Sequence, residues 1–422
     1  MIITARRFYP VTRPVIEHGA LVIDGSRIVD IGDRRAILRK YPGQVVTDLG
    51  MRSAMPGLVN VHTHLELSHL QGLLGEHERF FDWITALVDA RRTHGMRGAK
   101  KPATAALGQV ISSGTTCVGD IAATKTALPA IIKSGIRAVS FQEVIGLDEG
   151  MAEGAFAGLM VRLVAARRLT GRTGGRLRSG ISPHSTYSVS DLLYRQLADY
   201  ISSNSSDICI HMSESYDELL SMCGSPSGMD SYMERYGWDR HPRNRARSPV
   251  EFARLAGVHK GLLAVHCVHV SKSDMKTLKA AGASVAHCPR SNHFLNVGRA
   301  PVEEMLAMGI NVALGTDSLT SNIDLDLWEE MRFAYLVNRL NAEQVIAMGT
   351  INGAKALGFG VVAGSLEPGK DADIVAVEEI DTGWKDPHQA LLLGAHRENI
   401  ALTMVQGRII HIKEGLRDET GL

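Results

Sequence analysis

"LVNVHTHLEL", residues 58 to 67, joins an apolar, β-branched run to two histidines that stand two positions apart. In a β-strand, residues i and i+2 point to the same side, so His62 and His64 can direct both imidazoles at one point. Two ligands of one metal ion must lie in this way. Taken alone, the pair is also open to a second interpretation, a hydrogen-bonded pair at a strand end. The rest of the chain has to decide between them.

Short apolar runs alternate with longer amphipathic stretches over residues 55–358, which is typical of repeated βα units and a parallel sheet. Eight of these runs have the composition of strands, and eight is the number that closes a (β/α)8 barrel. The predicted strands are residues 57–62, 115–120, 136–143, 178–184, 207–213, 262–267, 283–288 and 310–317. We therefore expect an α/β fold with a TIM-like barrel over 55–358.

Polar side chains stand at or just beyond the carboxyl end of every predicted strand. In a (β/α)8 barrel this rim carries the active site, whereas the interior is packed with branched apolar side chains. Eight such endings in register favour a shared pocket over chance. The residues are His62 with His64, then Asp120, Glu143, His184, His211, His266, His287 and Asp317.

Both termini have a different pattern from the middle of the chain. "GALVIDGSRIVDIG" (19–32) contains two short alternating runs around an Asp-Gly turn, which predicts a hairpin. "PGKDADIVAVE" (368–378) and "IALTMVQGRIIHI" (400–412) are also strand-like, with glycine at the turns. We expect residues 1–54 and 359–422 to form one small composite β-sandwich domain beside the barrel.

The composition is that of an ordinary globular protein. Across 422 residues the formal net charge is +1, and no basic patch is interleaved with aromatic residues, so binding to nucleic acid is not expected. No apolar run approaches the roughly 18 residues of a membrane span, and the opening "MIITARRFYP" lacks the features of a signal peptide. The expected location is the cytoplasm, with the five scattered cysteines as reduced core residues.

Three residues on later strands favour the metal interpretation of His62 and His64. These are His211, His266 and Asp317. Neutral imidazoles with a single carboxylate suit zinc or ferrous iron, and manganese also fits. A position left for water makes such a site catalytic, because a metal lowers the pKa of bound water to near 7 and favours hydrolysis. Asp317 could ligate the metal and accept a proton from that water, although an N-cap for the following segment explains it equally well on its own.

Glu214 follows His211 by three residues, in "HMSESYDE". A glutamate at a strand-to-loop junction is most often solvated surface. Beside a dication and facing a ring nitrogen, it could instead protonate that nitrogen while the adjacent carbon is attacked. This role fits deamination better than peptide cleavage.

The motifs "PGLVNVHTH", "HMSE", "AVHCVHV", "HCPRSN", "GTDS" and "GSLEPGKDADIVAV" together resemble the amidohydrolase superfamily over nearly the whole chain. The "HMSE" and "HCPRSN" forms are similar to its aminohydrolase branch. The resemblance implies one divalent metal, with zinc as the first choice. It also implies that Glu214 is the proton shuttle and that His266, rather than His269, orients hydroxide or substrate. No lysine ends the fourth predicted strand, which disfavours a binuclear centre. The implied ligands are His62, His64, His211 and Asp317.

The resemblance leaves several substrates open. Leu65 and Glu66 replace the Pro-Met that usually follows the second histidine in methylthioadenosine deaminases. The stretch "HTHLELS" is more similar to members that deaminate 6-aminodeoxyfutalosine in menaquinone biosynthesis. This substrate is an adenine nucleoside that carries a benzoate. The alternatives are deamination of methylthioadenosine, S-adenosylhomocysteine or adenosine, or hydrolysis of another heterocycle such as guanine, a pterin or a chlorotriazine. A non-catalytic barrel is disfavoured because all six implied site positions are filled. A homodimer is the expected assembly.

Five residues are candidates for contact with the substrate. The implied pocket residues are Glu66, His184, His287, Arg290 and Asn292. A benzoate or amino-acid tail calls for a cationic or hydrogen-bonding clamp, for which we consider Arg290, His184 and the basic stretch 238–248, while surface charge alone also explains that stretch. "FFDWI" (80–84) is either an aromatic wall against the heterocycle or an ordinary helix packed on the barrel.

Overall fold

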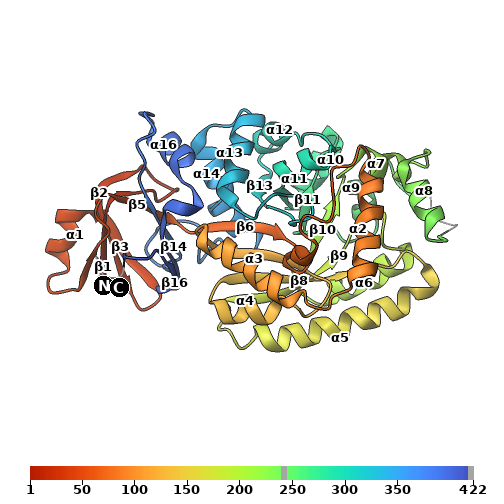
Figure 1. Ribbon diagram of the computed structural model, residues 1–422, viewed down its shortest axis with the longest axis horizontal. Helices are drawn as coiled ribbons and strands as arrows, with labels where there is room; N and C mark the ends of the chain where they lie inside the picture. Colours follow the sequence, from red (N-terminus) through yellow and green to blue (C-terminus); the bar gives the residue numbers. More distant parts are fainter. Residues whose placement is uncertain (239–244, 417–422) are drawn as a thin grey trace.

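The computed structural model describes residues 1–238 and 245–416. Eight parallel strands form two four-stranded sheets, in the order β6-β7-β8-β9 and β10-β11-β12-β13 (Figure 1). Each strand coincides with one predicted run. Their bounds are β6 Leu58–Thr63, β7 Thr115–Ala122, β8 Arg137–Val144, β9 Leu177–Pro183, β10 Cys209–Met212, β11 Leu263–His266, β12 Ser284–His287 and β13 Asn311–Leu314.

The two parallel sheets meet at both of their outer edges. Isolated parallel bridges pair Ile181 with Ile208, between β9 and β10, and Thr63 with Asp317, between β6 and the end of β13. Gly315 makes the second approach feasible, because a Cβ at this position would lie 2.7 Å from the Cβ of His62. The mixed α/β architecture is confirmed, and a closed barrel stays a prediction.

Helices connect the parallel strands, as the alternating pattern predicts. α5 (Ala152–Thr170), for example, lies between β8 and β9 in the chain and packs on both. Ser190 begins the helix after β9 by accepting a hydrogen bond from the backbone N–H of Leu193. The other helices of this region are α2 Phe80–His94, α3 Lys100–Ser112, α4 Leu128–Ser134, α6 Asp191–Ser203, α7 Tyr216–Met222, α8 Gly228–Arg235, α9 Pro249–Leu255, α10 Lys272–Ala280, α11 Pro289–Phe294, α12 Val302–Ala307, α13 Leu327–Val337, α14 Ala342–Met348 and α15 Ile351–Ala356.

Alternate residues of the parallel strands share one buried apolar cluster. Val59 and Val61 of β6 meet Val139 of β8 and Val265 of β11 there, and Phe359 from the segment after α15 completes the cluster. Side chains one position along each strand are therefore free to face the surrounding helices. Four of the cysteines are buried and unpaired as expected, whereas Cys223 is exposed and so is not a core residue.

Strands from both ends of the chain form a third sheet, in the order β16-β15-β14-β5-β1-β2-β3, with β4 paired to β1. β14 joins the two ends by pairing antiparallel with β5. Strands of both termini thus share one sheet, and the composite β-sandwich domain stays a prediction. The bounds are β1 Ile2–Phe8, β2 Ile16–Asp24, β3 Arg27–Asp33, α1 Arg34–Lys40, β4 Val46–Asp48, β5 Arg52–Pro56, β14 Ile374–Glu378, α16 Pro387–Gly394, β15 Ile400–Val405 and β16 Arg408–Ile412.

A buried ion pair network connects the terminal sheet to the parallel strands. Arg137, at the start of β8, donates to Asp373 at 2.9 Å and to Asp371 at 2.8 Å. Both carboxylates come from the "GKDADIV" stretch that leads into β14. Removing one partner would leave a buried charge uncompensated, so this junction constrains the two parts strongly.

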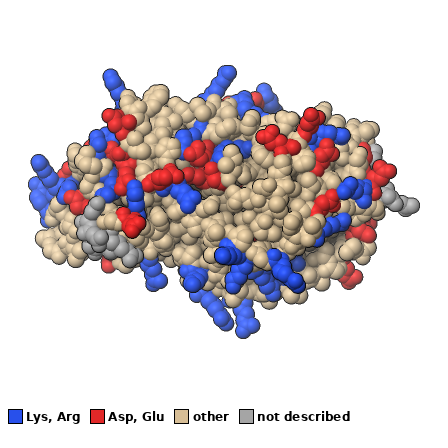
Figure 2. Space-filling view, viewed as in Figure 1, with Lys and Arg blue, Asp and Glu red and all other residues tan. Residues whose placement is uncertain are grey.

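Charged side chains of both signs are interspersed on the face seen in Figure 2. Among the helices that the structure describes, none combines the length and the apolar character that crossing a bilayer requires.

Candidate active site

Four predicted ligands converge at the carboxyl ends of the parallel strands. The Nε2 atoms of His62, His64 and His211 lie 3.2 Å from one another, all three pairs alike. Oδ1 of Asp317 lies 3.4 Å from Nε2 of His62 and 3.4 Å from Nε2 of His64. Residues more than 240 positions apart in the chain thus present single ligand atoms to one point.

The spacing of these atoms fits a bound metal ion. A tetrahedron whose corners lie about 2.0 Å from its centre, the usual zinc-to-nitrogen distance, has edges of about 3.3 Å. Burial, with the neighbouring imidazoles, holds the pKa of His64 and of His211 well below the ordinary value, so both rings are neutral and offer lone pairs. Burial opposes ionisation of Asp317, but hydrogen bonding to His62 and the nearby imidazoles hold its pKa well below the usual range. Neutral nitrogens with one carboxylate form the donor set that a divalent cation prefers.

Neighbouring groups fix the orientation of these ligands. Nδ1 of His211 donates to the carbonyl oxygen of His184 at 2.7 Å, which leaves Nε2 unprotonated toward the cluster. Oδ2 of Asp317 accepts hydrogen bonds from Ser291 at 2.7 Å and from Ser321 at 2.6 Å, which leaves Oδ1 for the cluster. Ser291 therefore positions a candidate ligand.

His266 and Glu214 form a second pair beside the cluster. Nε2 of His266 lies 3.3 Å from Oε1 of Glu214, and its Nδ1 donates to Oδ1 of Asn292 at 2.8 Å. His269 instead contacts the carbonyl oxygen of Val297 at 2.8 Å, so His266 is the histidine of "HCVH" that the structure brings to the site.

Burial shifts the protonation of this pair toward the neutral forms. It raises the pKa of Glu214 well above the ordinary value, with Asp317 and Glu218 adding to the effect, and it lowers the pKa of His266 to about 4. The carboxyl of Glu214 therefore holds a proton to a higher pH than an ordinary glutamate does, and it can donate that proton. Glu218, one helical turn further on α7, accepts a hydrogen bond from the backbone N–H of Glu214 at 2.9 Å.

The strand ends that carry these residues have strained backbones. Ser213, His266 and Asp317 have positive φ values of 53°, 69° and 59°, in the left-handed region that residues other than glycine seldom adopt. Such strain persists only where the surroundings enforce it, and it clusters at functional sites. Here it turns the chain sharply at the end of β10, β11 and β13, so that side chains face the cluster.

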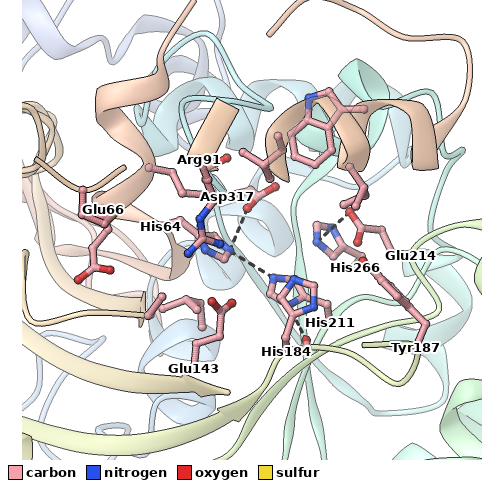
Figure 3. A pocket seen from close by; sticks show the side chains of 18 residues that line it. His64, Glu66, Arg91, Glu143, His184, Tyr187, His211, Glu214, His266 and Asp317 are labelled. Carbon is pink, nitrogen blue, oxygen red and sulfur yellow. Dashed lines mark hydrogen bonds and ion pairs between the residues drawn. The ribbon is translucent and has the colours of Figure 1, made fainter. Parts of the chain in front are cut away.

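A cavity that is open to solvent lies over the cluster. Glu214, His266 and Tyr187 lie on one side of it in Figure 3, and Arg91, Glu143 and Glu66 lie on the other side, beyond His64. We name these the reaction wall and the opposite wall. His64, His184, His211 and Asp317 also line the cavity.

The opposite wall comes from α2, from the segments that follow β6 and β7, and from the end of β8. Trp83 and Ile84 of "FFDWI" line the cavity, whereas Phe81 packs beneath it, its ring 5.3 Å from that of Tyr187. Both interpretations of this stretch therefore hold for different residues. Glu66 lines the cavity, but its carboxylate accepts hydrogen bonds from the backbone N–H groups of Thr124 and Thr126, at 2.9 and 3.0 Å.

Three residues predicted as substrate contacts do not lie on the cavity wall. Asn292 contacts His266 from behind, and His287 is buried with its Nε2 3.0 Å from Oδ1 of Asn338. Arg290 donates to Asp324 at 2.7 Å and lines a different surface hollow. The pattern "HCPRSN" places these side chains close to the rim but cannot say which way each one points. Residues 239–244 of the basic stretch 238–248 lie outside the described residues.

Several residues of the cavity have no predicted role, among them Tyr187, Glu143 and Arg91. Tyr187 follows the predicted strand end by three residues, and Glu143 is one of the predicted strand ends. Arg91 lies on α2, one helical turn beyond Leu87, and both side chains line the cavity. A signal was available for Arg91, because Ile84, Leu87 and Arg91 follow the spacing of one helix face.

Comparisons with known proteins agree with this geometry. Residues 53–410 match the Amidohydrolase family. A 5-methylthioadenosine/S-adenosylhomocysteine deaminase of Moorella thermoacetica is 29% identical over 419 residues, which cover 95% of this chain and 91% of the relative. The structure of Helicobacter pylori aminofutalosine deaminase in complex with Methylthio-coformycin is similar with a TM-score of 0.86 at 22% identity, covering 97% of this chain and 99% of that chain. An adenosine deaminase from Xanthomonas campestris with bound zinc has a TM-score of 0.83 at 24% identity, covering 98% of this chain and 94% of that chain.

At these identities the two structures establish a shared fold. The family match establishes membership of a family, because it extends over most of the chain and includes every residue of the histidine and aspartate cluster. The protein belongs to the amidohydrolase family.

Proposed function

We propose that this amidohydrolase is a metal-dependent hydrolytic deaminase of adenine nucleosides. The observation that carries the proposal is the pairing of two features in one cavity. One is a cluster of ligand atoms from His62, His64, His211 and Asp317, spaced as a tetrahedral metal site requires. The other is the buried carboxyl of Glu214, whose pKa is raised well above the ordinary value. Deaminase relatives support the same reaction.

A divalent cation, for which zinc is the first choice, would be held by these four residues and would supply the charge that makes a water molecule acidic near neutral pH. The side chains of the protein carry out the proton transfers and orient the water. Asp317 accepts a proton from the attacking water through a carboxylate oxygen, because a carboxylate with two oxygens can bind and accept at once. Glu214 gives its proton to the ring nitrogen next to the carbon under attack. His266, held by Asn292, orients the water and the developing oxygen.

The overall reaction adds water at the carbon that bears the amino group and releases that group as ammonia. The carbon–nitrogen bond breaks, and the carbonyl product keeps the oxygen of water. Glu214 suits the proton transfers because it lies 3.3 Å from His266 and is 5% exposed, so bulk water does not compete for its proton.

For the substrate we propose 6-aminodeoxyfutalosine, on the strength of "HTHLELS" and the likeness in fold to an aminofutalosine deaminase. The second candidate is deamination of methylthioadenosine or S-adenosylhomocysteine, which the name of the Moorella relative favours.

We also propose that the parallel strands of residues 55–358 close into one barrel, and that residues 1–54 and 359–422 form a separate β-sandwich domain. Bridges at both seams between the two parallel sheets support closure. Pairing of β5 with β14 supports a domain shared by both termini.

The test is ammonia release by the zinc-loaded protein from 6-aminodeoxyfutalosine, S-adenosylhomocysteine, methylthioadenosine, adenosine, guanine and a triazine. Release from one or more adenine nucleosides, reduced about 100-fold or more in a Glu214→Gln variant that keeps its metal, is the expected result. Silence on every nucleoside with metal bound would overturn the proposal. Release that Glu214→Gln leaves unchanged would overturn the role of Glu214.

A further inference from the structure

One face of α2 gives the opposite wall an apolar stretch that ends in a guanidinium. Ile84, Leu87 and Arg91 are spaced by three and four residues, so they lie along the same side of the helix, and all three line the cavity. Seven residues of helix correspond to about 10 Å along the axis. A group lying along this face would meet aliphatic side chains first and a cation at the far end.

Arg91 differs from the other half-buried arginines near the cavity. Arg162 donates to the carbonyl oxygen of Glu143, Arg245 donates to the carbonyl oxygen of Thr186 at 2.7 Å, and Arg290 pairs with Asp324. Within residues 1–238 and 245–416, by contrast, the guanidinium of Arg91 has neither a hydrogen bond nor an ion pair. Its five donors are thus available on the cavity side.

Two further groups on this wall also lack partners. The indole N–H of Trp83 is buried without a hydrogen-bond acceptor among the described residues, although Trp83 lines the cavity. Glu143 is buried at the end of β8, and no ion pair joins it to Arg91 in the described part of the chain. Buried polar groups in native proteins are normally bonded, so unpartnered ones that line a cavity are available to bond a molecule that enters it.

The charge of Arg91 is felt across the cavity. It lowers the pKa of His184 in addition to burial, and it opposes the rise in the pKa of Glu143 that burial causes. Among the described residues, no ion pair joins Arg91 to Glu143 or to Glu66, whose carboxylate instead accepts hydrogen bonds from Thr124 and Thr126.

We propose that Arg91 binds a carboxylate at the end of an apolar substituent on the nucleoside substrate, and so selects acidic substrates over neutral ones. This inference rests on the proposed function. The guanidinium offers two parallel N–H donors to a carboxylate, and the half-buried site strengthens the pair. Ile84 and Leu87 accommodate the apolar part of the substituent. The substrate class is therefore an adenine nucleoside whose 5′ group is apolar and ends in a carboxylate.

The experiment compares one substrate with its own neutral form. kcat and KM for ammonia release are measured with 6-aminodeoxyfutalosine and with its benzoate methyl ester, using wild type, Arg91→Met, Arg91→Lys and Arg92→Met. Arg92 is the matched control, because it is exposed and its guanidinium lies over the ring of Tyr236, 4.5 Å from the centroid. Arg91→Met should lower kcat/KM for the acid about 100-fold, mainly through KM, and for the ester less than about 3-fold.

Arg91→Lys should recover part of the loss on the acid, since lysine keeps the charge but not the paired donors. Arg92→Met should leave kcat/KM unchanged for both the acid and the ester. Equal losses of kcat/KM on acid and ester, or no loss on the acid, would overturn the role of Arg91. The proposed deaminase function would not be affected by that result. If wild type deaminates neither compound nor any other adenine nucleoside, the proposed function falls, and this inference falls with it.

Discussion

The two walls of the cavity are built in different ways. On the reaction wall and the floor, neighbouring side chains hold the groups that act on the substrate: Asp317 bonds to Ser291 and Ser321, and His266 bonds to Asn292. On the opposite wall, the guanidinium of Arg91 lines the cavity without a hydrogen bond or an ion pair among the described residues. Groups held by such bonds are preorganised for chemistry that stays the same from substrate to substrate. A charged group that is not held in this way is available to the part of the substrate that varies.

The difference follows from the elements that supply each wall. Strands β6, β10, β11 and β13 end at one rim, and their ends are held by neighbouring strands, so ligand atoms there are placed accurately. Helix α2 is inserted after the first strand and packs through Phe80 and Phe81 onto Tyr187. Its exposed turns can change without disturbing the rim.

The largest expected effect comes from Asp317→Asn on the reaction wall. An amide keeps the shape but loses the charge, and its NH2 cannot accept hydrogen bonds from Ser291 and Ser321 as Oδ2 does. We expect ammonia release to fall about 1,000-fold or more, with weaker metal binding. Kinetics with metal content measured on the same sample checks this. Near-normal activity would contradict the role of Asp317 as metal ligand and proton acceptor, and with it the proposed difference between the two walls.

A smaller loss is expected from Asn292→Ala, because Asn292 acts through His266. Without its acceptor, Nδ1 of His266 is released, and the ring no longer holds one tautomer and one orientation. Activity should fall 10- to 100-fold. Asn338→Ala is the matched control, since Asn338 contacts His287 in the same manner at 3.0 Å but away from the cavity. Equal losses in both variants would mean that Asn292 contributes only to folding.

On the opposite wall, Glu66→Gln should act mainly on KM. The carboxylate accepts from Thr124 and Thr126 and so shapes the segment after β7. Glutamine replaces one acceptor oxygen with a donor, and we expect KM to rise up to about 10-fold with kcat nearly unchanged. Steady-state kinetics on the preferred nucleoside separates an effect on KM from an effect on kcat. A fall in kcat alone would place Glu66 with the reaction wall instead.

The smallest effect concerns stability and pH on the reaction wall. Burial raises the pKa of Glu218 to about 7, although Thr186 and the backbone N–H of Glu214 oppose the rise. The folded protein therefore holds this proton more tightly than the unfolded chain, whose glutamates titrate at about 4.3. The stabilisation is complete below that value and is lost as the pH rises to about 7.

Glu218→Gln removes this pH dependence because glutamine does not titrate. The Tm of the variant relative to wild type should therefore increase from pH 5 to pH 8, as thermal unfolding at both values would show. A difference in Tm that is the same at both pH values would contradict the shifted pKa.

The sequence predicted the reaction side well because strand geometry is local. The i, i+2 spacing of His62 and His64 and the position of His211 at a strand end required only the period of a β-strand, and the structure brings these side chains together. All eight parallel strands were found for the same reason. Closure of the sheet depends on the angle between distant strands, which no short stretch of sequence specifies.

The opposite side could not be predicted in the same way. Which face of α2 meets the cavity depends on how the helix packs, so Arg91 was missed although its spacing from Leu87 was visible. Arg290 is a candidate because it is cationic and lies in the motif "HCPRSN", but Asp324 is available to pair with it in the folded protein. Side chains in loops and short helices are decided by such partners, which lie far away in the sequence.

The account is tested most directly by titrating the chelator-stripped protein with Zn²⁺ while measuring bound zinc and ammonia release from the preferred adenine nucleoside. If His62, His64, His211 and Asp317 hold one catalytic cation, activity is absent without metal, rises in proportion to bound zinc and saturates at one equivalent. Deamination by the metal-free protein, or saturation only at two equivalents, would contradict the single-metal centre on which the account depends.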